Sequence, residues 1–405
     1  MPTTPTSRRL RVLLAFDKFK GSLTAPEACA AAAAGLRAAQ PDWEIESCPL
    51  ADGGDGFASI LTRAAGGRLE RRQVTGPRGD PIEAAFGLVP LARIPVRARQ
   101  RLALGSGLAA DATVALVEMA TASGLALLPP DQRDPWQTSS LGTGELMRAA
   151  ADAGAGVILL GVGGSATHDL GLGALAALGL ELRDNHGEKV HPPVPARWDD
   201  ITQFGAGPLA LSLSNGLPLP PVRIACDVTN SLLGSNGAAA VFAPQKGLRP
   251  ADRARLEHGT VRLALMLTAR FRRPDSLIDQ PGSGAAGGIA FGLMAALGAE
   301  LVAGFELVSD WLDLEARMQA ADLVITGEGR FDASSLVGKG PGSVVRRALA
   351  LGKTVHVFAG MISTAEVPPA VRCHALATTG TPGAEQLART AVLLQQQVAT
   401  VFVSP

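Results

Sequence analysis

The stretch that decides the fold of this chain reads Val157-Ile-Leu-Leu-Gly-Val-Gly-Gly-Ser-Ala-Thr-His-Asp169. An apolar, β-branched run ends in a loop that carries glycines, two hydroxyl groups and a carboxylate, and a run of small residues follows. This order is typical of a buried strand, a turn and a helix. Glycines let the backbone approach phosphate oxygens, and N–H groups at the start of the helix point at them. The stretch therefore predicts an α/β protein with an anion-binding loop.

The bulk composition limits the class of protein. With 405 residues and 47% hydrophobic content the chain can bury a large core, and two domains are expected at this length. The 37 basic residues balance 37 acidic ones, which argues against nucleic acid or an anionic membrane as a partner. The four cysteines lie far apart, and no apolar run is long enough to cross a membrane. We therefore expect a cytoplasmic protein with free thiols.

Apolar runs alternate with helical segments along most of the chain, which predicts parallel sheets covered by helices. The first two and the last three runs should form one five-stranded, doubly wound sheet, and they are 11–16, 45–50, 322–326, 354–359 and 373–377. The middle of the chain then forms a second α/β domain inserted into the first. The expected divisions are 10–67 plus 289–405 for the first domain, 68–288 for the inserted one, a disordered tail at 1–9, and an Arg-rich hairpin or mobile loop at 90–111.

A carboxylate follows each of five apolar runs, and these residues are Asp17, Asp52, Glu118, Asp227 and Glu328. Ligands of open α/β sheets bind beyond the carboxyl ends of the strands, so we expect these acids to converge at one edge. Any one of them alone would be interpreted more simply as a helix cap or a turn residue. Converging carboxylates suit phosphoryl transfer, which needs them to hold magnesium or to accept a hydroxyl proton.

Several further loops could bind phosphate groups. Glycine-rich segments open predicted helices at 142–145, 163–167 and 284–288, and Lys246 lies in a turn where its ammonium could neutralise a phosphate. Each glycine-rich loop could equally serve tight packing of a helix on a strand. A P-loop is excluded, because no glycine precedes 338–342 at the required spacing and Gly340 replaces the Ser or Thr that binds magnesium.

The segment Gly161-Val-Gly-Gly-Ser-Ala166 also matches the dinucleotide-binding pattern G-x-G-x-x-A, with Glu181 and Asp184 near the distance of a ribose-binding acid. This match supports one rival function, an NAD(P)-dependent oxidoreductase of a small hydroxy acid. A second rival is a non-catalytic sugar-acid sensor, although the chain shows no DNA-binding helix pair with a basic face. The hydroxyl-bearing loop up to Asp169 fits phosphate and metal better than a dinucleotide. We expect His168 to be a hydrogen-bonded loop residue rather than a base.

An ordered set of motifs spans about residues 10–402. The first is Asp17-Lys-Phe-Lys-Gly-Ser22. The others are, in chain order, Ala51-Asp-Gly-Gly-Asp-Gly56, Val117-Glu-Met-Ala120, Gly142-Thr-Gly-Glu-Leu146, Gly163-Gly-Ser-Ala-Thr167, Ala225-Cys-Asp-Val-Thr-Asn230, Pro244-Gln-Lys-Gly247, Gly284-Ala-Ala-Gly-Gly288 and Thr326-Gly-Glu-Gly-Arg330. These motifs and their order resemble the type 1 glycerate kinase family. The chain departs from the family pattern at Asp55, His168, Leu170 and Ser231, where Glu, Asn, Gly and Pro are usual.

The resemblance implies ATP-dependent phosphorylation of D-glycerate, with 2-phosphoglycerate favoured over 3-phosphoglycerate as the product. It implies ATP and Mg²⁺ as cofactors, glycerate as the small-molecule partner and, as an option, a homodimer. It also implies a flavodoxin-like domain, an inserted α/β domain and an active site in the cleft between them. The departures at 168–170 touch the loop quoted first, so they could alter substrate preference or turnover.

The mechanism that we expect is in-line transfer of the γ-phosphoryl group to a hydroxyl of glycerate. The expected catalytic residues are Lys20, Asp169 and Asp227, with the roles of base and magnesium ligand left open between the two carboxylates. Lys20 should orient the substrate together with Asp17 and Ser22, because its ammonium would oppose the glycerate carboxylate. The other expected substrate contacts are Asp52 and Arg330. The expected nucleotide and phosphate ligands are Gly163, Gly164, Ser165, Thr167, Lys246 and Glu328.

Overall fold

The computed structural model describes residues 9–104, 108–109, 111–205, 219–333, 335, 340–363, 367–376 and 387–403, which form two compact units. Unit 1 comprises the chain up to Asp52 and again from Val308, and unit 2 comprises Gly53–Leu307. The sequence placed 53–67 and 289–307 with the first sheet, whereas they belong to unit 2. One reason is that α2 (Phe57–Ala64) packs on three strands of unit 2. The predicted tail lies, up to residue 8, outside the described residues.

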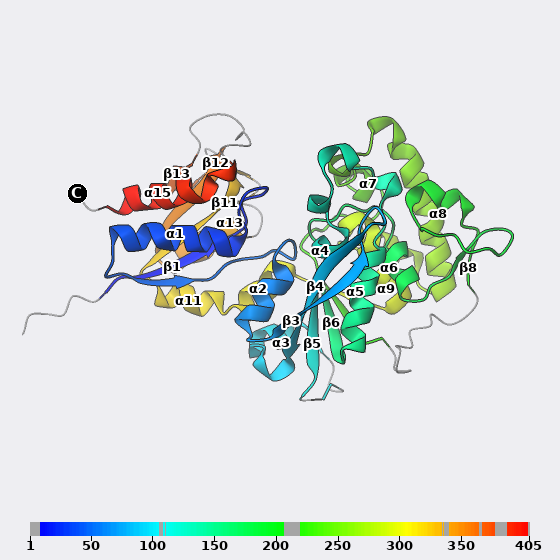
Figure 1. The fold of residues 1–405 in the computed structure, drawn as a ribbon, viewed down its shortest axis with the longest axis horizontal. Coiled ribbons are helices and arrows are strands. Elements are labelled where there is room, and N and C mark those ends of the chain that lie inside the picture. The colour runs from blue at the N-terminus through cyan, green and yellow to red at the C-terminus, as the bar shows by residue number, and fades with distance from the viewer. Residues whose placement is uncertain are drawn as a thin grey trace, which may run out of the picture. The chain divides into compact units, whose positions relative to one another are not determined.

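Unit 1 is built on a five-stranded sheet in which all neighbouring strands are parallel (Figure 1). Its strands are β1 (Arg11–Phe16), β2 (Glu44–Ser47), β11 (Leu323–Phe331), β12 (Thr354–Ile362) and β13 (Val371–Ala375), in the spatial order β13-β12-β11-β1-β2. They correspond to the five runs predicted to share a sheet. Its helices include α1 (Ala25–Ala39), α11 (Leu314–Ala320), α13 (Pro341–Ala350) and α15 (Thr390–Phe402).

Helices pack on both faces of this sheet. Alternate residues of β1 point to one face, where they form a core with α1 and α15, while α11 and α13 contact β1 from the other side. The capping box that starts α1 is confirmed, because Thr24 Oγ1 accepts a hydrogen bond from Glu27 N and the Glu27 carboxylate accepts one from Thr24 N. Gly35 lets α1 lie close to α15, since a Cβ there would be 2.4 Å from Gln395 O.

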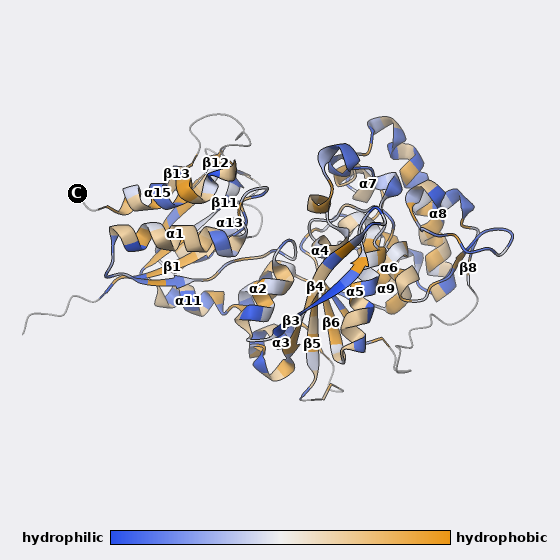
Figure 2. Ribbon diagram, in the orientation of Figure 1, coloured by the Kyte–Doolittle hydropathy of each residue, from blue (hydrophilic) through white to orange (hydrophobic). Residues whose placement is uncertain are grey.

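Unit 2 contains a six-stranded mixed sheet with the order β10-β9-β6-β5-β4-β3. Its strands are β3 (Arg68–Thr75), β4 (Pro81–Pro90), β5 (Thr113–Glu118), β6 (Ala155–Gly161), β9 (Val222–Ala225) and β10 (Glu300–Val302). The pairs β3–β4 and β4–β5 are antiparallel and the others are parallel. The edge strand β3 is hydrophilic along most of its length (Figure 2), as suits a strand with one unpaired side.

The remaining elements of unit 2 surround this sheet. They are α3 (Val96–Arg101), α4 (Met119–Ser123), α5 (Leu141–Asp152), α6 (Leu172–Ala177), β7 (Leu182–Arg183), β8 (Gln203–Phe204), α7 (Ala238–Val241), α8 (Arg253–Phe271) and α9 (Ala285–Leu297), with α10 (Gly304–Trp311) at the boundary of the units. The hairpin expected at 90–111 does not form, since Leu91–Arg93 is a 3-10 turn and α3 follows. Pro90 and Pro95 precede these turns and cannot donate to a strand ladder. Residues 105–107 and 110 lie outside the described residues.

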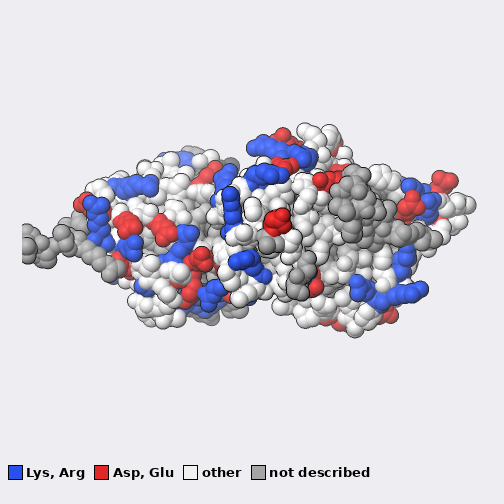
Figure 3. Space-filling view, turned by 90° about the horizontal axis from the view of Figure 1, so that it is seen from below, with Lys and Arg blue, Asp and Glu red and all other residues white. Residues whose placement is uncertain are grey.

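Charges of both signs are mixed over the surface that Figure 3 shows, in keeping with the equal numbers of acidic and basic residues. In the part of the chain that the structure describes, no helix is both long and apolar enough to span a membrane.

Candidate active site

A pocket of about 470 Å³ opens in unit 1 at the carboxyl ends of β1 and β11. The strand order reverses between these two strands, and ligands of open α/β sheets bind at such a point. Asp17 follows β1 directly and donates its backbone N–H to Gly327 O at 3.0 Å. The pocket is lined by all the predicted site residues of unit 1, namely Asp17, Lys20, Ser22, Asp52, Glu328 and Arg330. The structure therefore brings these six residues together.

A tight turn after β1 carries two lysines of the pocket, Lys18 and Lys20. Ser22 Oγ donates a hydrogen bond to Phe19 O at 3.2 Å inside this turn. Gly21 has a φ of +79°, a left-handed conformation that glycine adopts without strain. The short connection between β1 and α1 therefore fixes the backbone positions from which the side chains of both lysines extend into the pocket.

The charged residues that line the pocket are three cations and three carboxyl groups, namely Lys18, Lys20, Arg330, Asp17, Asp52 and Glu328. Lys18 Nζ lies 4.0 Å from Asp52 Oδ1, and Arg330 Nε lies 3.4 Å from Asp332 Oδ2. Such a mixed lining can hold a small polyhydroxy acid, because the cations attract its carboxylate and the acids accept hydrogen bonds from its hydroxyl groups.

Glu328 has an unusual environment within this lining. Burial raises the pKa of its carboxyl to about 7, although a hydrogen bond with Ser335 lowers it, and the carboxylates of Asp17, Asp332 and Asp52 raise it further. Its Oε1 is buried and has no hydrogen-bond partner among the residues described. The charge of the pocket therefore depends on pH near neutrality.

The apolar wall of the pocket was not predicted from the sequence. It consists of Phe19, Gly360, Met361, Leu376, Leu387 and Leu393, with Thr390 beside them. Gly360, Met361 and Leu376 lie near or just beyond the ends of β12 and β13, so the carboxyl-end rule could have found them if applied to every strand. The leucines at 387 and 393 lie before and in α15, and no sequence pattern points to them.

Asp169, predicted as a base or magnesium ligand, is fully buried in unit 2. Its Oδ2 accepts hydrogen bonds from Ser140 N and Ser140 Oγ, both at 2.7 Å, and from Gly173 N at 3.2 Å. Its Oδ1 accepts a hydrogen bond from Gly171 N at 3.1 Å. The carboxylate thus takes the place at the starts of α5 and α6 where the sequence predicted a phosphate. Asp169 therefore stabilises the starts of α5 and α6. It could act as a base or bind magnesium only if these hydrogen bonds were replaced.

Lys246, a predicted phosphate ligand, is only 1% exposed. Its Nζ donates hydrogen bonds to Ser165 Oγ at 2.8 Å and to Thr167 O at 2.5 Å. Burial lowers the pKa of its ammonium to about 7, although the Asp169 carboxylate opposes this shift. The side chain therefore holds the loop at 163–169 from inside unit 2, and a phosphate would have to compete with these contacts.

His168 is a hydrogen-bonded loop residue, as the sequence predicts. Its Nε2 lies 3.4 Å from Thr260 Oγ1. Burial and, to a smaller extent, the Lys246 ammonium lower the pKa of His168 to about 3. The imidazole is therefore neutral at physiological pH.

Replacing Lys246 by methionine should change how stability depends on pH. The unfolded chain keeps the lysine proton up to about pH 10.5, whereas the folded chain loses it near pH 7. Between these values the unfolded state binds more protons, so Lys246 makes the wild-type free energy of unfolding rise with pH through that window, by at most ~1.4 kcal/mol per pH unit. Lys246→Met should lack this rise.

The measurement is urea unfolding of both proteins at pH 7, 8 and 9. The difference between the two curves is the quantity of interest, because titrations shared by both proteins, such as those of the buried thiols of Cys29 and Cys48, cancel. If the free energies of unfolding of the two proteins change with pH in parallel, Lys246 stays charged in the folded protein.

The glycine-rich loops of unit 2 pack closely against neighbouring backbone. A Cβ at Gly163 would lie 2.6 Å from Gly54 Cα, and a Cβ at Gly287 would lie 2.3 Å from Thr167 O. Real Cβ atoms do not approach so closely, so the absence of a side chain is required at both positions. Close packing, the structural alternative that the sequence left open, accounts for these glycines. Their role as phosphate ligands stays a prediction.

Two of the five carboxylates expected at one edge lie elsewhere. Glu118 ends a strand of unit 2, and its oxygens accept hydrogen bonds from Gly56 N at 3.0 Å and Ala58 N at 3.1 Å, so it caps α2. Asp227 follows β9, and its Oδ2 accepts a hydrogen bond from Phe305 N at 2.7 Å. The expectation of a single edge was wrong because a sequence shows where a strand ends, but not to which sheet it belongs.

Magnesium does not fit the predicted pair of ligands. Among the described residues, no three His, Cys, Asp or Glu side chains gather in a way that could hold a metal ion. The oxygens of Asp169 are engaged by four internal donors, which leaves them poorly placed to bind an ion as well. We therefore derive no step through magnesium held by Asp169 and Asp227.

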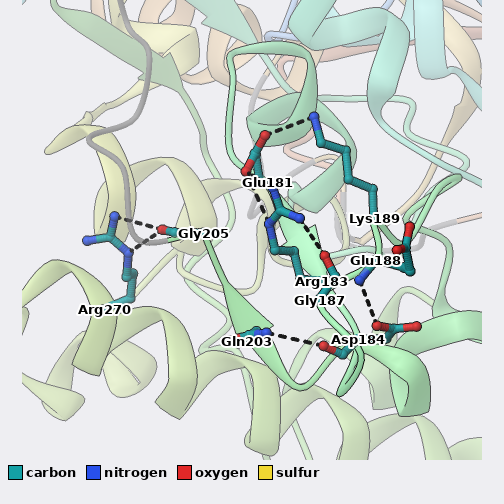
Figure 4. A network of polar contacts seen from close by, with 9 residues as sticks. All are labelled: Glu181, Arg183, Asp184, Gly187, Glu188, Lys189, Gln203, Gly205 and Arg270. Atoms are coloured by element: carbon teal, nitrogen blue, oxygen red, sulfur yellow. Dashed lines mark hydrogen bonds and ion pairs between the residues drawn. The ribbon is translucent and has the colours of Figure 1, made fainter.

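The acids that a dinucleotide site would need belong to a local surface network (Figure 4). Glu181 pairs with Arg183 Nη2 at 2.6 Å and with Lys189 Nζ at 2.8 Å, and these contacts lower the pKa of its carboxyl. Asp184 Oδ1 accepts a hydrogen bond from Glu188 N at 2.9 Å within the adjoining turn. Both acids are thus engaged within this network, and the structure gives the oxidoreductase no support.

Residues 12–403 match the model of the glycerate kinase family. The chain belongs to the glycerate kinase family. Similar proteins include the glycerate kinase of Bacillus subtilis (strain 168), 38% identical over 358 residues, and the glycerate 2-kinase of Escherichia coli (strain K12), 38% identical over 363 residues. Each match covers 87% of this chain and 86% of the relative. Membership makes the chain an ATP-dependent kinase.

The fold agrees with this family membership. A crystal structure of a protein described as glycerate kinase 2 from Salmonella typhimurium LT2 matches with a TM-score of 0.70 at 35% identity, over 97% of both chains. The mixed α/β architecture is therefore shared with a structure from the glycerate kinase family.

Proposed function

We propose that this family member is a type 1 glycerate kinase, which transfers the γ-phosphoryl group of ATP to D-glycerate and releases ADP and 2-phosphoglycerate. The observation that carries the proposal is the pocket of unit 1, where the predicted substrate residues line one cavity. The names of the relatives support glycerate as the substrate, and the name of the Escherichia coli relative supports the 2-phosphorylated product.

In the proposed reaction the chain acts mainly by positioning. The Lys20 ammonium opposes the glycerate carboxylate, and Asp17 and Ser22 hold its hydroxyl groups. One hydroxyl oxygen then attacks the γ-phosphorus of ATP in line with the bond to ADP. Fixing both reactants in this geometry removes most of the entropy cost of bringing them together.

The ATP-binding residues of this proposal come from the sequence and are Gly163, Gly164, Ser165, Thr167 and Lys246, and Lys246 would have to exchange its bonds to Ser165 Oγ and Thr167 O for a phosphate oxygen. Asp227, which is half-buried just after β9, stays a proposed catalytic residue, the one that unit 2 contributes. Magnesium belongs to the proposal as the ion that accompanies ATP, where it would neutralise phosphate charge. The cytoplasmic location and the homodimer stay predictions.

We also propose that unit 1 is a flavodoxin-like domain with unit 2 inserted into it. The spatial order β2-β1-β11-β12-β13 corresponds to the strand order 2-1-3-4-5 of flavodoxin-like sheets. All of unit 2 lies in the sequence between β2 and β11, which supports the insertion.

Purified protein supplied with ATP and magnesium chloride should release ADP with D-glycerate, and not with L-glycerate, with tartronate or without an acceptor. Phosphorus NMR of the product should show the phosphate on the C2 oxygen. ADP release at the same rate with and without an acceptor would contradict the proposal. So would the absence of ADP release with every acceptor tested. A phosphate on the C3 oxygen would contradict only the choice of product.

A further inference from the structure

The three carboxyl groups of the unit 1 pocket differ in how their oxygens are occupied. Asp17 Oδ1 accepts a hydrogen bond from Lys18 N at 2.7 Å. Asp52 is exposed, and its Oδ1 lies 4.0 Å from Lys18 Nζ. Glu328 is partly buried, and its Oε1 accepts no hydrogen bond from the described residues. Glu328 therefore has acceptor capacity that the described residues around it do not use.

Glu328 lines the pocket in which the substrate of the proposed reaction would bind. Glu328 lies in β11, one residue after Gly327, and Gly327 O receives the hydrogen bond from Asp17 N at the point where the strand order reverses. It lines the same cavity as Lys20 and Arg330, the cations expected to hold the substrate. A hydroxyl that attacks phosphorus must lose its proton, and a carboxyl group that titrates near neutrality is suited to take it.

We propose that Glu328 is a catalytic residue that accepts the proton of the attacking glycerate hydroxyl, an inference that rests on the proposed function. The hydroxyl oxygen forms a bond to the γ-phosphorus of ATP. The bond from that phosphorus to the bridging oxygen of ADP breaks, and its electron pair stays on ADP. The hydroxyl proton passes to the Glu328 carboxylate and goes to water after the product leaves. This role replaces the phosphate contact that the sequence suggested for Glu328.

Protonation of Glu328 should affect rate and affinity in opposite directions. The charged groups around it are Asp17, Lys18 and Lys20 after β1, Asp52 after β2, and Arg330 and Asp332 further along its own strand segment. The pocket residues from β12, β13 and α15 carry no charge. Ionised Glu328 can take a proton, but it also places a negative charge near the glycerate carboxylate. As the pH rises through about 7, kcat should therefore rise and the affinity for D-glycerate should fall.

The test compares wild type with Glu328→Gln, in which the side chain keeps its size and stays neutral. Turnover and D-glycerate binding, the latter by calorimetry without ATP, are measured from pH 5.5 to 8.5. We expect kcat to fall by about a hundredfold in Glu328→Gln. The acidic limb of the rate profile and the loss of affinity above pH 7 should both disappear. A role in folding alone would not abolish both pH dependences while binding at low pH persists.

Asp332→Asn is the matched control. Asp332 does not line the pocket, but its carboxylate raises the pKa of Glu328, so its loss should move the limb to lower pH and keep the plateau rate within a few-fold. A Glu328→Gln protein that keeps the acidic limb, or one that turns over within threefold of wild type, would overturn the inference. Wild type that releases no ADP with D-glycerate at any pH would instead overturn the proposed function on which it rests.

Discussion

The Lys20→Ala variant should lose at least about a hundredfold in kcat/KM for D-glycerate, equivalent to ~3 kcal/mol of transition-state stabilisation. Lys20 lines the unit 1 pocket on the turn after β1, together with Lys18. Without its ammonium, the substrate carboxylate would face Asp17 and Asp52 with less compensating charge. Most of the loss should appear in KM, because the contact with the carboxylate exists before the transfer as well as during it.

Steady-state kinetics with D-glycerate at saturating ATP would measure this loss. Lys189→Ala is the control, because Lys189 is an exposed lysine of unit 2 that pairs with Glu181 on the surface, where such pairs contribute little. Lys20→Arg, which keeps the positive charge, should recover part of the affinity. If Lys20→Ala stays within threefold of wild type, Lys20 does not hold the substrate.

Asp169→Ala should lower the free energy of unfolding by roughly 4 kcal/mol, because it leaves several buried donors without an acceptor and each unpaired group typically costs 1–3 kcal/mol. These donors are the backbone N–H groups of Ser140, Gly171 and Gly173 and the Ser140 hydroxyl. The total stability of a domain is commonly about 5–15 kcal/mol, so the change should be plain in urea unfolding.

Asp169→Asn separates a structural role from a catalytic one. Its amide keeps the shape of the carboxyl, but its NH₂ group would face one of the backbone donors, so we expect a smaller loss of about 1–3 kcal/mol. Turnover per folded molecule should then remain within tenfold of wild type. Full stability with a loss of turnover beyond a hundredfold would restore Asp169 as the base that the sequence predicted.

The sheet and the pocket of unit 1 were largely predictable from the sequence. Apolar runs mark the strands, and a residue just after such a run, such as Asp17, must lie at the carboxyl edge. Because parallel strands share that edge, Asp52 and Glu328 could be placed beside Asp17 without knowing any distance. The opening motif added Lys20 and Ser22 because they lie within five residues of Asp17.

The roles in unit 2 could not be predicted in the same way. Asp169 lies among glycines and hydroxyl groups, which is the pattern of a ligand site, but the donor that engages it most closely is Ser140, 29 residues earlier. Lys246 resembles a phosphate ligand in the sequence, and only its burial shows that it points inward. Side chains that satisfy internal donors and those that bind ligands are the same residue types, so composition does not separate them.

The split of unit 1 has a consequence for the growing polypeptide. β1 pairs with β11, and Ala15 and Thr326 on these strands are 311 residues apart. At typical rates of 5–20 residues per second, a ribosome would need roughly 15–60 s between making the two strands. During that time the inner edge of β1 has no partner, and an open strand edge invites pairing with other chains. The sheet of unit 1 is thus begun before unit 2 is made and completed only after it, and a holding chaperone would be most useful to the nascent chain before β11 emerges.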